Sequence, residues 1–436
     1  MLAVVFIAVF FSSIVGAQVF GISINKLALL PLELYLLYYS FGKTKYTLNN
    51  KNQIVLIIWY LIAFFSSISG MLFMVVVNPR AEEILGSNIQ FMVSIIVIYI
   101  PIALMLWNAK KNVFFVNAFK KSFIITGKIH ALWGIVQFIL YNSIGYDLNY
   151  QFLGKIFPGN DWTSYSNLAG SSVGILLRVS GINHDPAFYG LLLIVAFVLD
   201  ENILWRVIYF SCMILSFSRS ALLSLAVVVL FWTVQKARRI WKFDIKKSLK
   251  IISVVLIICF VASTVVSNNQ YVQNQLTRLV ERFSTIQTGG DGTSRHMRYP
   301  LASLLIMIGE VPFLQKLLGV GVDCGGILIT KYQHSIPWLE LSKSMKDVTF
   351  VWAVESDLAN VLLGTGFIGA FTYYLFYFWT FLKAKGDVVK LSLTLALISF
   401  SVMYNMAGIT FVQLIYICFI ANSCNLSNPL KIDKAP

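Results

Sequence analysis

The chain of 436 residues is 58% hydrophobic and only 12% charged, with a net charge of +15. A soluble domain has about twice that share of charged residues, so the composition excludes a soluble globular domain, a disordered chain and a small disulfide-linked secreted protein. The apolar stretches are continuous rather than alternating, which excludes a β-barrel. We therefore predict an all-α, polytopic integral membrane protein. About twelve membrane helices of about 20 residues would use about 240 residues, close to the apolar content.

In chain order, twelve apolar segments are predicted to form these helices. They lie at 2–22, 25–41, 53–77, 90–107, 122–142, 186–202, 203–217, 219–234, 250–267, 357–382, 390–405 and 406–423. The chain then divides into helices 1–9 (residues 1–267), one long polar loop (268–356), and helices 10–12 with a tail (357–436). Within the loop, residues 296–318 have the apolar spacing of a helix. Its length and charges favour a position on the membrane or against the bundle.

Basic residues predict the orientation of the chain. They cluster at 42–53, 108–121, 235–250 and 383–390, and in the tail at Lys431 and Lys434. All five clusters fall on one side if the twelve helices simply alternate, so the positive-inside rule places them and both termini in the cytoplasm. The excess of positive charge therefore indicates membrane orientation rather than a nucleic-acid partner. The nearly neutral long loop, residues 143–185 and a tight turn at 216–219 are then extracytoplasmic.

Four arginines on the predicted outer face are the main functional signal: Arg178, Arg219, Arg295 and Arg298. A guanidinium stays charged and can bind two phosphate oxygens at once. Several of them converging near the lipid interface would suit a lipid diphosphate. The alternative is that each one pairs with a nearby acid or extends its charge into the interface.

Two glycine-rich stretches have different interpretations. Consecutive N–H groups in 319–326 can form an anion-binding nest to which Gly319 and Gly321 would belong, or the stretch is an ordinary turn. The Gly364–Gly369 stretch lies in an apolar segment and is typical of a helix-packing face.

Candidate general bases also lie on or beside the predicted outer face. His184, His334 and Glu355 could each accept a proton from an acceptor hydroxyl. Asp185, directly before Pro186, is instead typical of a residue that caps a helix. The residue types alone do not identify which of these three is the general base.

The order and spacing of these motifs resemble the O-antigen polymerase and O-antigen ligase superfamily of bacterial envelopes. The matching pieces span roughly 176–370 and are Arg178–Gly181 before Asp185–Pro186, Ser218–Ser220, Ser294–Arg295, Gly319–Gly321 and Gly366–Gly369. Residues 1–170 match in hydropathy alone.

The resemblance implies an inverting glycosyltransferase of the bacterial inner membrane that needs neither metal nor cofactor. Its substrates would be undecaprenyl-diphosphate-linked glycans, with membrane lipid as its surroundings and a chain-length regulator as a possible protein partner. Arg178, Arg219 and Arg295 would hold the diphosphate and stabilise its charge as it leaves. We expect a polysaccharide polymerase that joins a growing glycan to a lipid-linked repeat unit at the periplasmic face.

Two alternatives stay open. An O-antigen ligase would transfer the finished glycan to lipid A core, but ligases commonly carry a His-Asn pair where this chain has Glu355-Ser356-Asp357. A polysaccharide flippase or transporter is the alternative from another class. The chain has no phosphate-binding loop for ATP, and its few ionisable residues within helices speak against ion-coupled transport.

Overall fold

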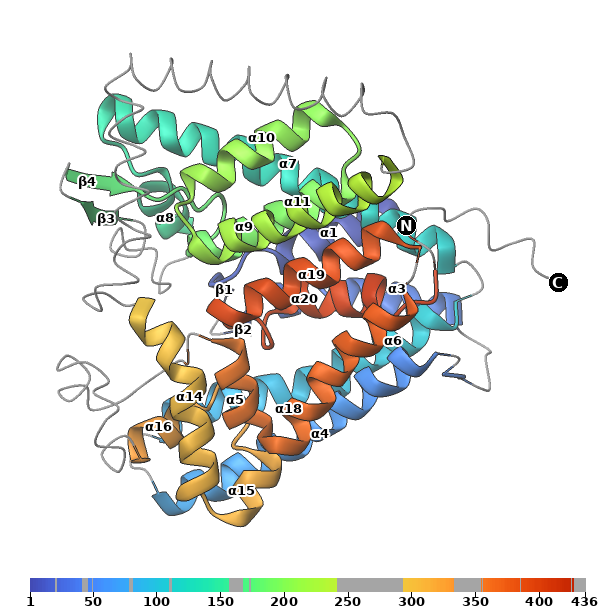
Figure 1. Cartoon of the computed structure of the whole chain (residues 1–436), viewed down its shortest axis with the longest axis vertical. Coiled ribbons are helices and arrows are strands. Elements are labelled where there is room, and N and C mark those ends of the chain that lie inside the picture. Colours follow the sequence, from blue (N-terminus) through green and yellow to red (C-terminus); the bar gives the residue numbers. More distant parts are fainter. Residues whose placement is uncertain are drawn as a thin grey trace.

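The computed structural model describes residues 1–19, 22–40, 46–48, 50–77, 81–109, 112–156, 168–171, 174–240, 293–332, 354, 356–384, 386–424 and 426. The architecture is helical (Figure 1), with two short antiparallel strand pairs. Five helices are long and apolar enough to cross a membrane, at Lys51–Met74, Asn88–Trp107, Asn112–Ile144, Arg219–Lys236 and Asp357–Lys383. Shorter apolar helices accompany them. The length and composition of these helices support the prediction of an integral membrane protein with several spans.

The N-terminal region is less regular than predicted. Helix α1 (Leu2–Ser12) is followed by strands β1 (Gln18–Val19) and β2 (Ile22–Ser23), and then by α2 (Ile24–Leu27) and α3 (Leu30–Ser40). The predicted helices at 2–22 and 25–41 are therefore too long. Hydroxyls of Ser12 and Ser13 bind the carbonyls of Val9 and Phe10 at the end of α1, and Gly16 then turns the chain with φ +95°. Serine side chains that bind the backbone in this way favour helix ends.

The next segment forms long helices that include the predicted ones, but the helices predicted at 90–107 and 122–142 begin nine and ten residues earlier, at Ala81 and Asn112. They are α4 (Lys51–Val77), α5 (Ala81–Ser94), the π-helical turn η1 (Ile95–Tyr99), α6 (Ile100–Trp107) and α7 (Asn112–Ile144). Pro101 near the start of α6 has no N–H to donate, and the helix changes to π geometry just before it, a usual response to a lost hydrogen bond. After α7 come η2 (Asn149–Leu153), α8 (Gly154–Ile156), β3 (Leu168–Ser171) and β4 (Gly174–Leu177).

Helix α9 (Pro186–Leu199) is the centre of the main core. All 14 of its residues are buried, and it packs on α7, α10 (Ile203–Leu215), α11 (Arg219–Ile240) and α19 (Val388–Met403). A helix that is apolar on every side is stable only when it is surrounded in this way. The predicted tight turn between α10 and α11 is present, and Phe217 in it adopts φ +48°.

Helices from the predicted long loop pack against the bundle, one of the two expected positions. These are α14 (Thr293–Gly309), α15 (Phe313–Leu318) and α16 (Gly326–Tyr332). The predicted helix at 296–318 is thus two helices, because Pro312 starts a new one. In Figure 1 they lie beside α4 and α18 (Asp357–Lys383), and α14 and α15 both contact α18. A second apolar core fills this part of the molecule.

Helix α18 is broken, which the sequence did not predict. Gly366 has non-helical angles of φ 66° and ψ −172°. The Tyr373 hydroxyl donates to Oδ2 of Asp357 at 2.7 Å, although 16 residues of continuous helix would span about 24 Å. The two arms of α18 therefore fold back on each other, and the prediction of one continuous helix at 357–382 is wrong. The chain continues through α19, α20 (Thr410–Ile415) and the π-helical turn η4 (Tyr416–Ile420).

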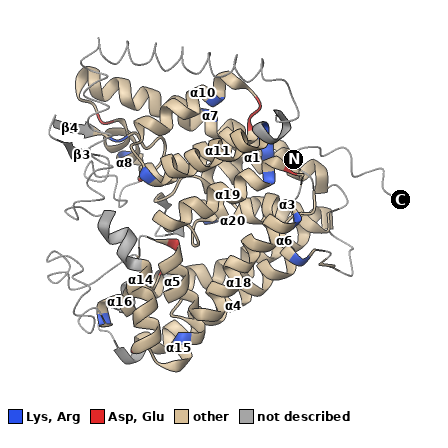
Figure 2. Cartoon of the chain, viewed as in Figure 1, with Lys and Arg blue, Asp and Glu red and all other residues tan. Residues whose placement is uncertain are grey.

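The basic segments gather at one end of the bundle. Thr47 binds Asn108 through its backbone N–H at 3.0 Å, and Asn112 binds Asn422 at 3.1 Å. Lys390 donates to the carbonyl of Asn422 at 2.7 Å. Figure 2 shows that Lys and Arg lie mainly at helix ends and that the helices between are almost free of charge, as expected of helices that cross a lipid core. That this end faces the cytoplasm stays a prediction.

Candidate functional site

The segment that carries Arg178 is held by buried polar side chains from α7 and η2. The N–H of Ser180 donates to Oε1 of Gln137 at 3.1 Å. Nδ2 of Asn149 donates to the Ser180 hydroxyl at 2.9 Å and to the carbonyl of Gly181 at 2.8 Å. Buried amides that bind backbone groups fix a loop more firmly than apolar contacts do, because each lost bond would leave a polar group unsatisfied. The position of Arg178 is therefore defined by the fold.

His184 fastens the same segment to the turn after α1. Its Nδ1 lies 2.9 Å from the carbonyl oxygen of Val15, and the N–H of Val15 donates to Oδ1 of Asn183 at 2.9 Å. A carbonyl oxygen only accepts, so Nδ1 of His184 carries the hydrogen. A Cβ on Gly16 would lie 2.6 Å from this nitrogen, so the close contact requires glycine. His184, a predicted candidate base and substrate-binding residue, thus has a positioning role in the fold.

Arg178 lies beside a carboxylate, Asp185, and the hydroxyl of Tyr404. Oδ1 of Asp185 accepts from the N–H of Ala187 at 2.7 Å and caps α9, and Oδ2 accepts from the Tyr404 hydroxyl. Burial lowers the pKa of the Arg178 guanidinium from its usual value, and the negative charge of Asp185 opposes that shift. Because arginine stays protonated in proteins, the result is a cation held beside an acid. The predicted capping role of Asp185 is confirmed.

Arg219 comes to the same end of the bundle. The N–H of Val179, next to Arg178, donates to the carbonyl of Leu215 at 3.1 Å. Leu215 ends α10, and Arg219 begins α11 after the tight turn. The structure therefore brings together two of the arginine-bearing segments that the sequence singled out.

A second group of polar residues, which we call the central polar cluster, consists of Lys26, Asp323, Asn360 and Asn405. Nδ2 of Asn360 donates to Oδ1 of Asp323 at 2.9 Å and to Oδ1 of Asn405 at 2.8 Å. Nδ2 of Asn405 also donates to Asp323 at 2.6 Å, and Lys26 attracts Asp323 electrostatically. Asn405 directly follows Tyr404, so this cluster continues the group around Arg178.

Three interruptions of regular backbone meet at this cluster. They are the 319–325 turn, the break in α18 at Gly366 and the 404–409 segment between α19 and α20. Asp357, at the start of α18, binds the last of them by accepting from the N–H groups of Met406 at 3.1 Å and Ala407 at 2.8 Å. Irregular backbone is tolerated within a membrane protein only where protein surrounds it or where it lines a polar cavity. The convergence therefore marks a specialised place in the fold.

Gly319 and Gly321 allow the turn to approach the break in α18. The N–H of Val320 donates to the carbonyl of Leu363 at 3.1 Å, and that of Gly321 donates to the carbonyl of Gly364 at 2.8 Å. A Cβ on Gly319 would lie 2.3 Å from Gly364. These two N–H groups bind carbonyls of the protein, which favours the turn interpretation over an open anion nest.

The remaining predicted site residues are not placed. Arg295 and Arg298 belong to α14, but their side chains lie outside the described residues, as do His334 and Glu355 entirely. Among the side chains that the structure does describe, no group of three His, Cys, Asp or Glu could hold a metal ion.

The sequence alone does not single out five residues of this site: Lys26, Asp323, Asn360, Tyr404 and Asn405. Asp323 is part of the glycine-rich stretch, and its φ of +64° is uncommon for a residue other than glycine. Tyr404 and Asn405 lie at the boundary between two predicted helices, and this position is the one feature of the sequence that could have indicated them. Their meeting depends on contacts between residues 37 to 219 positions apart, which one sequence does not reveal.

Comparison of the chain with protein-family models and with curated proteins gives no match.

Proposed function

We propose that this protein is a polysaccharide polymerase of the bacterial inner membrane. It would transfer a growing glycan from undecaprenyl diphosphate onto a lipid-linked repeat unit at the periplasmic face. The observation that carries the proposal is the approach of the Arg178 and Arg219 segments at one end of the bundle, with Asp185 beside Arg178. About twelve membrane helices and cytoplasmic termini are part of the same proposal.

The reaction would be a single displacement at the anomeric carbon of the donor. A sugar hydroxyl of the acceptor attacks that carbon, the bond to the diphosphate oxygen breaks, and the hydroxyl proton passes to a base. Arg178 and Arg219 would stabilise the negative charge that grows on the leaving diphosphate, which is electrostatic catalysis. Attack from the opposite side inverts the configuration at the anomeric carbon.

In this mechanism one residue positions Arg178 and a different residue acts as the general base. Asp185 is fixed by Ala187 and Tyr404 and would hold the Arg178 guanidinium in place. Because Asp185 has this positioning role, the candidates for the base stay those that the sequence gives: His184, His334 and Glu355.

Surface glycolipid from a strain lacking the gene, complemented with variants, tests the proposal. Arg178→Ala and Arg219→Ala should each reduce the polymer ladder about 100-fold or more, the usual cost of removing one group that stabilises developing charge, and leave a band with one repeat unit. Lys155→Ala is the matched control, because Lys155 is an exposed cation on α8 near the same end. Protein amounts are compared by immunoblot. A full ladder from Arg178→Ala at the normal protein amount contradicts the proposal.

A transporter of lipid-linked glycan is the second candidate, and the break in α18 favours it. Discontinuous helices that meet polar side chains form the substrate sites of many secondary transporters. The place where lipid-linked single repeats accumulate in the null strain separates the candidates. They accumulate on the cytoplasmic side of the membrane if the protein is a flippase and on the periplasmic side if it is a polymerase. Finished polymer that stays on its carrier lipid would instead identify a ligase.

A further inference from the structure

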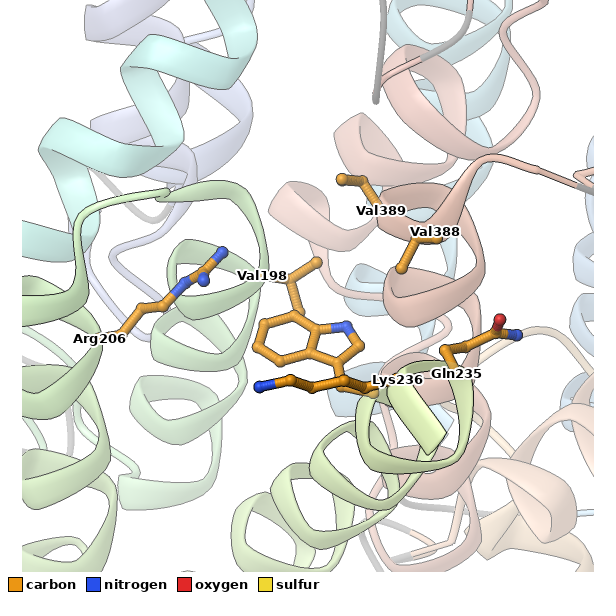
Figure 3. Close-up of a pocket in the computed structure, with 7 residues that line it drawn as sticks. Val198, Arg206, Gln235, Lys236, Val388 and Val389 are labelled. Atoms are coloured by element: carbon orange, nitrogen blue, oxygen red, sulfur yellow. The ribbon is translucent and has the colours of Figure 1, made fainter. Parts of the chain in front are cut away.

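We propose that a pocket at the opposite end of α9 from Arg178 binds the head group of an anionic phospholipid. The pocket has a volume of about 260 Å³ and lies where the end of α9 meets α10, α11 and the start of α19. Figure 3 shows Arg206 on one side and Val388 and Val389 on the other, with Val198 and Lys236 between them. This site is separate from the proposed polymerase site and does not depend on it.

The Arg206 guanidinium is held in a defined position. It lies 4.9 Å from the centre of the Trp232 ring, and its Nε donates to the carbonyl of Phe197 at 3.2 Å. The rings of Phe197 and Trp232 stack at 5.3 Å, and Nε1 of Trp232 donates to the hydroxyl of Ser392 at 2.7 Å. An arginine stacked on an aromatic face keeps its outer N–H groups directed to an anion in the plane of the guanidinium.

The positive charge of the pocket is not balanced by a close acid within the described part of the chain. The ion pairs found there join Lys120 to Glu201 and Lys128 to Asp200, so no described carboxylate lies within 4 Å of Arg206 or Lys236. Glu201 attracts Arg206 only at longer range, and its pKa is lowered chiefly by the hydrogen bond from Lys120. Two cations that share one pocket attract a phosphate.

The other walls favour a lipid over a soluble anion. Val198, Val388 and Val389 present apolar surface next to the two cations. A volume of 260 Å³ equals about nine water molecules at about 30 Å³ each, which suits a glycerol-linked phosphate. Basic pockets between helices on the cytoplasmic side commonly hold anionic head groups, and this pocket opens at the end where the basic segments gather.

The test uses the full-length protein, purified and freed of lipid, with bound phospholipid counted by native mass spectrometry. Phosphatidylglycerol is compared with phosphatidylethanolamine at equal concentration. We expect phosphatidylglycerol to bind the wild type at least about fivefold more tightly. Arg206→Gln and Lys236→Gln should each remove most of this preference, and the double variant should remove all of it.

Two controls decide what the site recognises. Lys51 also lies over a tryptophan, with Nζ 5.0 Å from the ring of Trp379, but it does not line the pocket, so Lys51→Gln should keep the preference. Soluble glycerol phosphate should not displace the lipid at equal concentration, because it lacks the acyl chains that meet the valines. The proposal is overturned if the double variant keeps the preference, if Lys51→Gln loses it equally, or if glycerol phosphate competes as well as the lipid.

Discussion

Helices α7 and α18 differ in a way that explains how this fold forms its central polar cluster. Both are long and apolar, and both contain glycines packed closely against neighbours. A Cβ on Gly134 of α7 would lie 2.2 Å from the hydroxyl of Tyr189, and one on Gly366 of α18 would lie 2.2 Å from the carbonyl oxygen of Leu317. Yet α7 is helical over its 33 residues, while α18 is broken.

The difference lies in whether the segment packed beside each helix has backbone N–H groups available for hydrogen bonds. Breaking α18 at Gly366 leaves the carbonyls of Leu363 and Gly364 without their partners four residues on, and Val320 and Gly321 supply the missing N–H groups. Helix α7 packs on α1, α9 and α10, whose own N–H groups are used within those helices. A glycine thus permits a break, and an external donor makes it stable.

The largest effect is expected for Gly366→Ala. Its φ of 66° and ψ of −172° belong to a region that glycine alone adopts readily, and the added methyl would meet Leu317. We expect a loss of about 3 kcal/mol or more in the free energy of unfolding, measured by thermal or denaturant unfolding in detergent. Gly386→Ala is the control, because Gly386 has φ +95° but no atom within 4 Å of its Cβ position; it should cost about 1 kcal/mol. Equal losses would show that the contact at the break is unimportant.

Asp357→Ala should have the next largest effect. The Asp357 carboxylate, in the first arm of α18, accepts hydrogen bonds from the Tyr373 hydroxyl in the second arm and from the N–H groups of Met406 and Ala407. Its removal leaves these buried donors unsatisfied. We expect a loss of about 2–3 kcal/mol, with partial recovery in Asp357→Asn, which keeps one acceptor oxygen. Tyr373→Phe removes a hydroxyl that donates to Asp357 and also lies 2.7 Å from the Tyr416 hydroxyl, so it should cost about 1–2 kcal/mol. If Asn recovers nothing over Ala, the hydrogen bonds to Met406 and Ala407 do not stabilise the fold.

A smaller effect than that of Asp357→Ala is expected in α7, where glycine serves packing alone. Gly134→Ala should cost about 1–2 kcal/mol, because the methyl group meets the Tyr189 hydroxyl in a filled core. Tyr189→Phe removes that oxygen, so the double variant should be less destabilised than the sum of the two single variants. The same unfolding measurement gives the coupling. Strict additivity would show that the two residues do not touch.

Part of the site could be predicted. The distribution of positive charge singled out Arg178 and Arg219, and the Asp-Pro pair predicted the cap that Asp185 provides, because both signals depend on neighbours in the sequence. The pairing of Asp323 with Asn360 and Asn405, and the contact of Tyr404 with Asp185, depend on segments that pack together only after the helices form. No local preference encodes such contacts.

The sequence by itself determined that this is a helical protein with several membrane spans, since long apolar stretches must satisfy their backbone polar groups within helices. It also located the turn between α10 and α11. Only the tertiary structure decided where regular helix fails. Residues 13–19 leave the helical path because serine side chains and a turning glycine compete with it, and α18 breaks because a distant loop donates hydrogen bonds to the freed carbonyls. Hydropathy measures transfer into lipid and contains no information on such partners, so it predicts unbroken helices at both places.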